Sequence, residues 1–169
     1  MRRSIATIAR IGVVAAAYAV ITANPALAQV SYGPLQLRLA EMLKPLVVWE
    51  PELIPAFVIG NFLGNLSSPF VGPWELVWMP FANLVGAWAC WHVGRINAYA
   101  GAAVYAVITA AAVTTMLAVL LHASFIVIGP PILASELLII VLGVPVMWPV
   151  HTALRRMLGD PRAQSARAR

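Results

Sequence analysis

Ala98–Leu121 is the stretch that most constrains the fold, because it is an apolar run long enough to cross a lipid bilayer. It contains no charged side chain, and a transmembrane helix needs about 20 mostly apolar residues. Further apolar runs recur along a chain that is 62% hydrophobic and only 10% charged. The sequence therefore predicts an all-α membrane protein rather than a soluble domain.

Proline- and glycine-containing turns divide the chain into six predicted helices, at residues 4–23, 35–49, 53–66, 74–92, 98–121 and 132–154. Pro45 is expected to bend the second helix. The step Gly60-x3-Gly64 in the third helix and the alanine step in the fifth are close-packing patterns. We expect a six-transmembrane-helix bundle over residues 1–154, followed by a basic, disordered cytoplasmic tail over residues 155–169.

The placement of arginine and lysine predicts the orientation, because cytoplasmic loops carry the excess of these residues. Arginines cluster before the first helix and after the sixth, so both termini are expected inside, as an even number of spans requires. Lys44 and Arg95 then fall near the inner turns, and no outer loop holds a Lys or Arg. We expect a multi-pass protein of the inner (plasma) membrane.

An alternative for the N-terminus is a cleaved signal peptide, since Ala26-Leu27-Ala28 is typical of a signal-peptidase site. Cleavage there would leave five spans and put the C-terminus on the wrong side. The orientation argument therefore favours a retained first helix.

Four polar residues from four helices are expected at a similar depth near the outer face. Arg38, Glu75 and Glu136 each follow a proline that opens a helix, and Asn65 ends the third helix. Charged groups inside a bilayer are costly and mark functional sites by default. The pattern predicts a pocket open to the outside, which Tyr32, Trp74 and Trp78 are close enough in sequence to line.

Each of these residues also has an ordinary structural interpretation. Arg38 and Glu41 lie three apart and can neutralise each other. The aromatic residues can form an interfacial belt, and Glu75 can lie in headgroup water. Glu136 is the hardest to explain without a function, because it lies in an apolar run with no cation nearby in sequence.

Several classes of protein are disfavoured by what the sequence lacks. There is no basic face interleaved with aromatics, as a nucleic-acid binder needs. No catalytic constellation, phosphate-binding loop, cofactor motif or metal-ligand spacing occurs, so we expect neither an enzyme nor a metalloprotein. The single cysteine, Cys90, excludes an intramolecular disulfide.

Three segments resemble the QueT family, small integral membrane proteins taken to import queuosine precursors. The first is SYGPLQLRLAEMLKPL, with Arg38 and Glu41 three apart, the second is IPAFVIGNFLGNL, and the third is SELLIIVLGVPV, which begins just before Glu136. Glu75 and Asn83 stand where the family more often has aspartate and threonine. These departures lie in the fourth helix.

The resemblance implies the substrate-binding (S) component of an energy-coupling factor (ECF) transporter. Such proteins bind a vitamin-like molecule at the outer side and work with a transmembrane coupling protein and two ATPase subunits. The small-residue face of the first helix resembles the motif that contacts the coupling subunit. That face consists of Gly12, Ala15, Ala16 and Ala19.

The predicted ligand is a 7-deazaguanine such as preQ1 or preQ0. We expect Glu136 to accept hydrogen bonds from the guanine-like edge, and Arg38 to donate to the ring carbonyl or to hold Glu41 in place. Glu41 or Glu75 would meet an aminomethyl cation, and Tyr32 or Trp74 would stack on the base. The full set of expected ligand residues is Tyr32, Arg38, Glu41, Asn65, Trp74, Glu75, Asn83 and Glu136.

Two alternatives to this function remain at the level of sequence. One is an S component for another vitamin or nucleobase, with the same fold and a different pocket. The other is a membrane scaffold that assembles with partners and binds no small molecule.

Overall fold

The computed structural model describes residues 2–27 and 37–157, and these residues form an all-α protein without strands. The order is α1 (Arg2–Ala23), η1 (Pro25–Leu27), η2 (Leu39–Leu43), α3 (Leu46–Trp49), η3 (Pro51–Leu53) and α4 (Ile54–Asn65). There follow η4 (Trp74–Trp78), α5 (Met79–Gly94), α6 (Ala98–Leu121) and α7 (Phe125–Met157). The predicted fold class is confirmed. Among the described residues, three segments are long and apolar enough to cross a membrane, namely Ile5–Ala23, Ala98–Leu121 and Phe125–Ala153.

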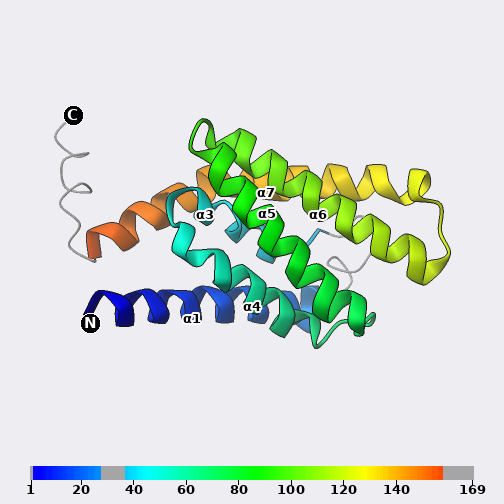
Figure 1. Cartoon of the computed structure of the whole chain (residues 1–169), viewed down its shortest axis with the longest axis horizontal. Helices are drawn as coiled ribbons and strands as arrows, with labels where there is room; N and C mark the ends of the chain where they lie inside the picture. The colour runs from blue at the N-terminus through cyan, green and yellow to red at the C-terminus, as the bar shows by residue number, and fades with distance from the viewer. Residues whose placement is uncertain (1, 28–36, 158–169) are drawn as a thin grey trace.

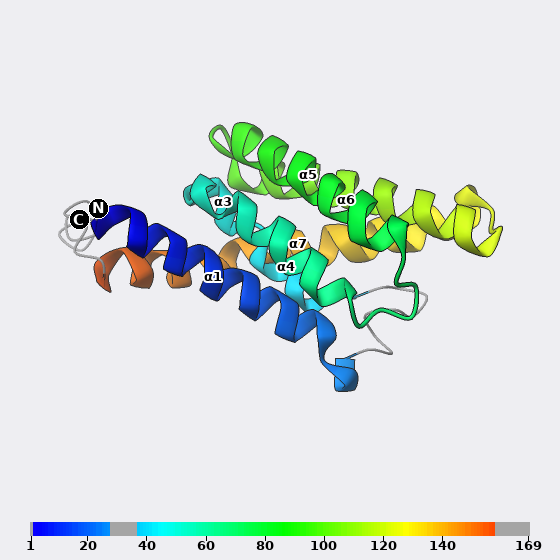
Figure 2. The same ribbon diagram turned by 60° about the horizontal axis from the view of Figure 1, so that its bottom comes forward.

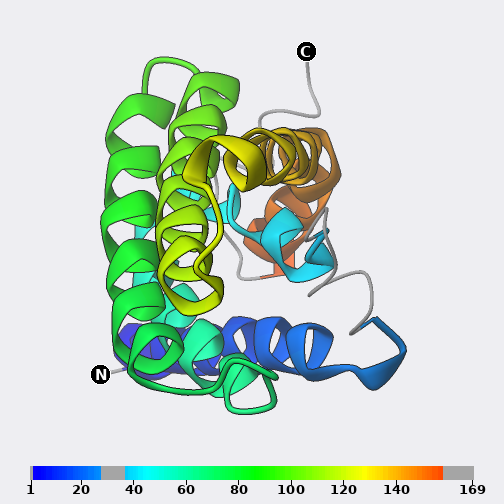
Figure 3. The same ribbon diagram turned by 90° about the vertical axis from the view of Figure 1, so that its right-hand side faces the viewer.

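Figures 1 and 2 show the start of α1 and the end of α7 at the same end of the molecule, which we call the terminal end. The opposite end, called here the far end, carries the turn 66–73 and the connection between α6 and α7. Viewed along the long axis, the short segments η2 and α3 lie between α1 and α7, with α5 and α6 alongside (Figure 3). We call residues 38–53 the central segment.

The second predicted helix is wrong as a continuous span. The central segment instead contains the 3-10 helix η2, a turn at Lys44-Pro45, the single α-helical turn α3 and the 3-10 helix η3. Pro45 has no N–H for a helical ladder, and non-helical backbone at membrane depth is tolerated only where protein surrounds it. Burial supplies that condition, because Lys44 and Val47 are fully buried.

Close approach of helices depends on small residues at the predicted positions. A methyl group on Gly60 would lie 2.9 Å from the Ala15 carbonyl oxygen, and one on Gly64 would lie 2.8 Å from Cβ of Thr22. The Gly60-x3-Gly64 step is therefore a close-packing site, as predicted, and its partner is α1. The alanine step of α6 is buried as well, with Ala102 and Ala106 both at 0% exposure.

The last helix begins earlier than predicted. Pro130 and Pro131 were expected to open it, but α7 starts at Phe125 and contains both prolines in its second turn. The carbonyl of Ser124 accepts hydrogen bonds from Val127 and Ile128 and so closes the first turn. The helix ends at Met157, so Arg155 belongs to it and not to the predicted tail. Residues 158–169 and the Ala28 cleavage site lie outside the described residues.

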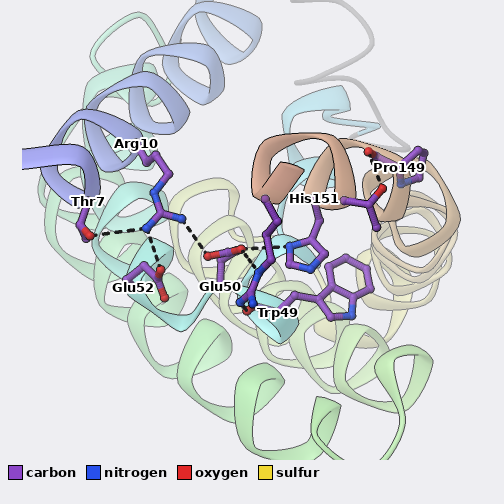
Figure 4. A network of polar contacts seen from close by, with 9 residues as sticks. Thr7, Arg10, Trp49, Glu50, Glu52, Pro149 and His151 are labelled. Atoms are coloured by element: carbon purple, nitrogen blue, oxygen red, sulfur yellow. Dashed lines mark hydrogen bonds and ion pairs between the residues drawn. The ribbon is translucent and has the colours of Figure 1, made fainter. Parts of the chain in front are cut away.

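The terminal end is held by an ion-pair cluster that we call the clasp (Figure 4). Glu50 accepts hydrogen bonds from Arg10 of α1 at 3.0 Å and from Arg155 of α7 at 3.0 Å. His151 Nδ1 lies 3.1 Å from the same carboxylate, and Arg10 also pairs with Glu52 at 3.0 Å. The clasp therefore connects α1 and α7 through the turn that follows α3.

Candidate ligand site

Arg38, Asn65 and Glu75 meet in the interior near the far end, where the sequence predicted that polar groups converge. Arg38 Nη1 donates to Asn65 Oδ1 at 3.4 Å, and Arg38 Nη2 lies 3.5 Å from Glu75 Oε1. The three side chains come from the central segment, α4 and η4, and none is more than 2% exposed. Glu75 is thus buried and not in headgroup water.

A π-helical turn places Glu75 in this position. In η4 the Met79 N–H bonds to the Trp74 carbonyl, five residues back. In the same register the Glu75 carbonyl would pair with residue 80, which is a proline and has no N–H. Asn65 Nδ2 donates to the Glu75 carbonyl at 3.1 Å instead. Asn65 therefore completes the backbone of the turn that carries Glu75, and such π turns are frequent at functional sites.

Deeper in the bundle, Glu41 is held on both oxygens. The Tyr18 hydroxyl donates to Oε1, and the Lys44 ammonium pairs with Oε2. Lys44 also donates to Thr109 Oγ1 at 3.1 Å and lies 4.5 Å from the centre of the Tyr105 ring. The prediction that Lys44 lies near an inner turn is therefore wrong, because it is fully buried against the middle of α6.

Glu136 of α7 is buried, and one of its carboxylate oxygens is without a hydrogen bond in the described part of the chain. Its side chain is 1% exposed, and Oε2 has no hydrogen-bond partner among the residues that the structure describes. Glu75 Oε2 and Asn61 Nδ2 are also buried without a hydrogen-bond partner among these residues. Glu136 lies close enough to Glu41, Lys44 and Arg38 to interact with them electrostatically. A buried polar atom without a partner costs about 1–3 kcal/mol, so these atoms indicate a place for a bound molecule.

The other predicted ligand residues have different surroundings. Asn83 is used within the chain, because Nδ2 donates to the Met79 carbonyl at 3.0 Å and Oδ1 accepts from Tyr105 at 3.0 Å. Trp74 packs with Trp78, at 6.0 Å between ring centroids, over an apolar cluster of α5, α6 and α7. Tyr32 lies outside the described residues.

The predicted partner-contact face on α1 is divided by the fold. Ala15 is 3% exposed and packs against α4, while Gly12 and Ala16 are exposed. A methyl group on Gly12 would meet nothing within 4 Å. Gly12 and Ala16 therefore remain accessible on α1, beside the exposed side chains of Val13 and Val20.

Sequence reasoning did not include Tyr18, Lys44, Asn61, Tyr105 and Thr109 among the site residues. Two of them had a signal: Asn61 precedes Asn65 by one helical turn, and Lys44 follows Glu41 by three residues. Tyr18 and Tyr105 had none, because only the packing of α1 and α6 brings their hydroxyls to the centre. Within the described ranges, no group of three His, Cys, Asp or Glu residues is placed to hold a metal ion.

Comparison with known proteins identifies the family. The model of the QueT transporter family matches residues 8–152, which include every α-helix from α1 to α7 at least in part. The chain belongs to the QueT transporter family. It is a membrane protein of a transporter family, and the resemblance seen in its sequence is confirmed.

A curated relative of this QueT chain is the "Queuosine precursor transporter QueT" of Lactococcus lactis subsp. cremoris (strain MG1363). The two are 39% identical over 61 residues, which cover 36% of this chain and 36% of that protein. The chain thus matches about a third of that relative's length. No solved structure gave a significant match.

Proposed function

We propose that this chain is the substrate-binding S component of an ECF-type importer that captures a queuosine precursor, a 7-deazaguanine such as preQ1 or preQ0. Membership of the QueT family and the name of the Lactococcus relative support the substrate class. The observation that carries the proposal is the pair of buried carboxylate oxygens, Glu75 Oε2 and Glu136 Oε2, without partners in the described part of the chain.

The chemistry of the ligand matches what the site leaves unpaired. The guanine-like edge of a 7-deazaguanine carries a ring N–H and an exocyclic amine, which are donors, and a carboxylate is an acceptor with the right spacing for both. In our proposal Glu136 accepts from this edge through charge-assisted hydrogen bonds. Arg38 holds Glu75 in place, and Glu75 faces the ligand from η4.

The structure changes the role that we assign to Glu41. The sequence predicted that Arg38 donates to the ring carbonyl or holds Glu41 in place, but Glu41 is held by Lys44 and Tyr18. With both oxygens occupied, Glu41 is poorly placed to meet an aminomethyl cation. We propose that Glu41 forms part of the floor of the site, and that Glu75 and Glu136 make the ligand contacts.

The partners in this proposal are a transmembrane coupling protein and two ATPase subunits. They follow from the S-component resemblance, and the exposed Gly12 and Ala16 with the half-buried Ala19 on α1 are the part of the predicted face that we propose as the contact. In this proposal residues 1–154 form the binding domain, both termini lie in the cytoplasm, and the chain binds and releases its ligand without catalysis.

Thermal stability of the detergent-purified protein tests the substrate class. A ligand that binds only the folded protein adds ~2.7 kcal/mol at a hundred times its dissociation constant. We expect 7-deazaguanines to raise Tm, while guanine and common vitamins leave it unchanged. Stabilisation by a different vitamin would keep the S-component role and reject the substrate. Stabilisation by no compound of a protein shown to be folded would favour the scaffold alternative.

A further inference from the structure

Asn61 of α4 is a buried amide of which only half is used. Its side chain is 0% exposed, and Oδ1 accepts from Asn65 Nδ2 at 3.3 Å. Nδ2, which carries two N–H donors, has no hydrogen-bond partner within residues 2–27 and 37–157. Buried polar groups are almost always paired, so this donor points to a partner that is not part of the described chain.

The neighbouring Tyr18 hydroxyl donates its own hydrogen to Glu41, so its oxygen can accept at most one of the two N–H groups of Asn61. The Tyr18 hydroxyl lies close enough to the Asn61 side chain to interact with it, while Asn61 Nδ2 has no partner at full hydrogen-bond geometry among the described residues. The Tyr18 hydroxyl donates to Glu41, which in turn is paired with Lys44. Asn61 therefore presents its N–H donors beside Tyr18, Glu41 and Lys44, which are already paired with one another.

The unused donor shares neighbours with the two unused acceptors. Through Asn65, the Asn61 amide is linked to Arg38 and Glu75 on one side. On the other side, Tyr18 connects it to Glu41, with which Glu136 interacts electrostatically. A ligand that reaches both carboxylates would therefore pass the Asn61 amide.

We infer that Asn61 donates to the ring carbonyl of the ligand and so sets the preference for a 6-oxo deazapurine. The inference rests on the proposed function and deepens it. A guanine-like edge presents donors next to one carbonyl acceptor, so a site that reads it needs carboxylate acceptors next to one donor. Arg38, the donor favoured by the sequence, already donates through Nη1 and Nη2 to Asn65 and Glu75, and we therefore assign this role to Asn61.

The test compares two ligands that differ only at the ring carbonyl: 7-deazaguanine and its 6-thio analogue. Both keep the ring N–H and the exocyclic amine, but sulfur is a much weaker acceptor than oxygen. We expect the wild-type protein to bind the 6-oxo compound at least about tenfold more tightly. Asn61→Ala should weaken 6-oxo binding by about tenfold or more and bring the ratio of the two dissociation constants close to one.

Asn65→Ala is the matched control, since Asn65 lies one turn along the same helix but already donates to Asn61 and to the Glu75 carbonyl. It should weaken both ligands by a similar factor and leave their ratio as in the wild type. Asn61→Asp keeps the size of the side chain, replaces donors by acceptors, and should abolish 6-oxo binding. It tests the same contact if Asn61→Ala does not fold.

Two results would overturn the inference in different ways. If the wild-type protein binds 7-deazaguanine and Asn61→Ala keeps the wild-type ratio of the two ligands, the role of Asn61 is wrong and the proposed function stands. If the folded wild-type protein binds neither compound, the proposed function fails and the inference fails with it.

Discussion

At the scale of single residues, the buried pair of Lys44 and Glu41 shows how the interior tolerates charge. Both side chains are at most 1% exposed, and each has a second polar contact, to Thr109 and Tyr18 respectively. Such a pair need not add net stability, but removing one partner leaves an uncompensated buried charge. The pair is therefore sensitive to single substitutions.

Lys44→Met should lower the free energy of unfolding by about 3–5 kcal/mol, because the Glu41 carboxylate loses its counter-charge. Adding Glu41→Gln should restore part of that loss. Thr109→Val removes only the 3.1 Å hydrogen bond to Lys44 and should cost about 1 kcal/mol. Denaturant unfolding in detergent, followed by tryptophan fluorescence, measures all four proteins. A Lys44→Met protein as stable as the wild type would contradict the ion pair.

At the scale of elements, the π turn shows why local sequence and tertiary contacts must be considered together. The tract from Pro73 to Pro80 is readable as a helix start, and the sequence predicted a helix from residue 74. The π register was not predictable, because it depends on the Asn65 amide arriving from α4 to satisfy the Glu75 carbonyl. Glu75 points inward because the local sequence begins a helix here and because the Asn65 amide supports the π register.

Pro80→Ala tests this account of the π turn by restoring the missing N–H. Asn65→Ala in the wild-type protein should cost about 1–3 kcal/mol, because a buried carbonyl loses its donor. In the Pro80→Ala background the same substitution should cost clearly less. Unfolding free energies of the two single variants and the double variant give the coupling. If the costs of Asn65→Ala and Pro80→Ala simply add in the double variant, the Asn65 amide does not replace the missing N–H of Pro80.

The clasp is a second feature at the scale of elements, and Glu50 is the residue that its ion pairs to α1 and α7 share. Glu50→Gln removes the charge that Arg10 and Arg155 share and should cost about 2 kcal/mol, or about 5 °C in Tm. Glu52→Gln is the matched control, because Glu52 is 35% exposed and has a single ion pair with Arg10. It should cost less than about 1 kcal/mol. If the two substitutions lower the free energy of unfolding equally, Glu50 is not the central residue of the clasp.

Glu50 also predicts a dependence on pH. Burial alone would raise the pKa of this carboxyl group, but hydrogen bonds with Arg155 and Glu52 and the positive charges of Arg155 and Arg10 hold it below the ordinary value of 4.5. A carboxylate with a lowered pKa in the folded state stabilises the protein above that ordinary value and loses the effect as the pH falls below it. The Tm of the wild type should therefore fall more steeply below about pH 4.5 than that of Glu50→Gln. Parallel curves would contradict the lowered pKa.

At the scale of the whole molecule, hydropathy and the turn residues predicted the all-α membrane class and the order of the longer helices. The bounds of the helix Ala98–Leu121 agree with the prediction, because polar turns on both sides of an uncharged run limit where the helix can begin and end. The central segment was mispredicted, since its apolar residues and single prolines look like those of a bent span. Its broken form depends on Tyr18, Thr109 and the clasp, which lie far away in sequence.

The predicted orientation, with both termini in the cytoplasm, can be tested by cysteine labelling. In a Cys90→Ser background, Val71→Cys places a thiol in the far-end turn and Ile96→Cys places one in the turn between α5 and α6. Both positions are exposed, at 53% and 91%. A membrane-impermeant thiol reagent should label position 71 on intact cells and position 96 only after permeabilisation. The opposite pattern would invert the topology.

The most direct test of the central claim is the dissociation constant of a 7-deazaguanine for the purified wild-type protein and for Glu136→Gln. The account predicts a folded variant that binds about 10- to 100-fold more weakly, because a charge-assisted hydrogen bond to the ligand is lost. A Glu136→Gln protein that binds with wild-type affinity would contradict the claim that this unpaired buried carboxylate holds the ligand.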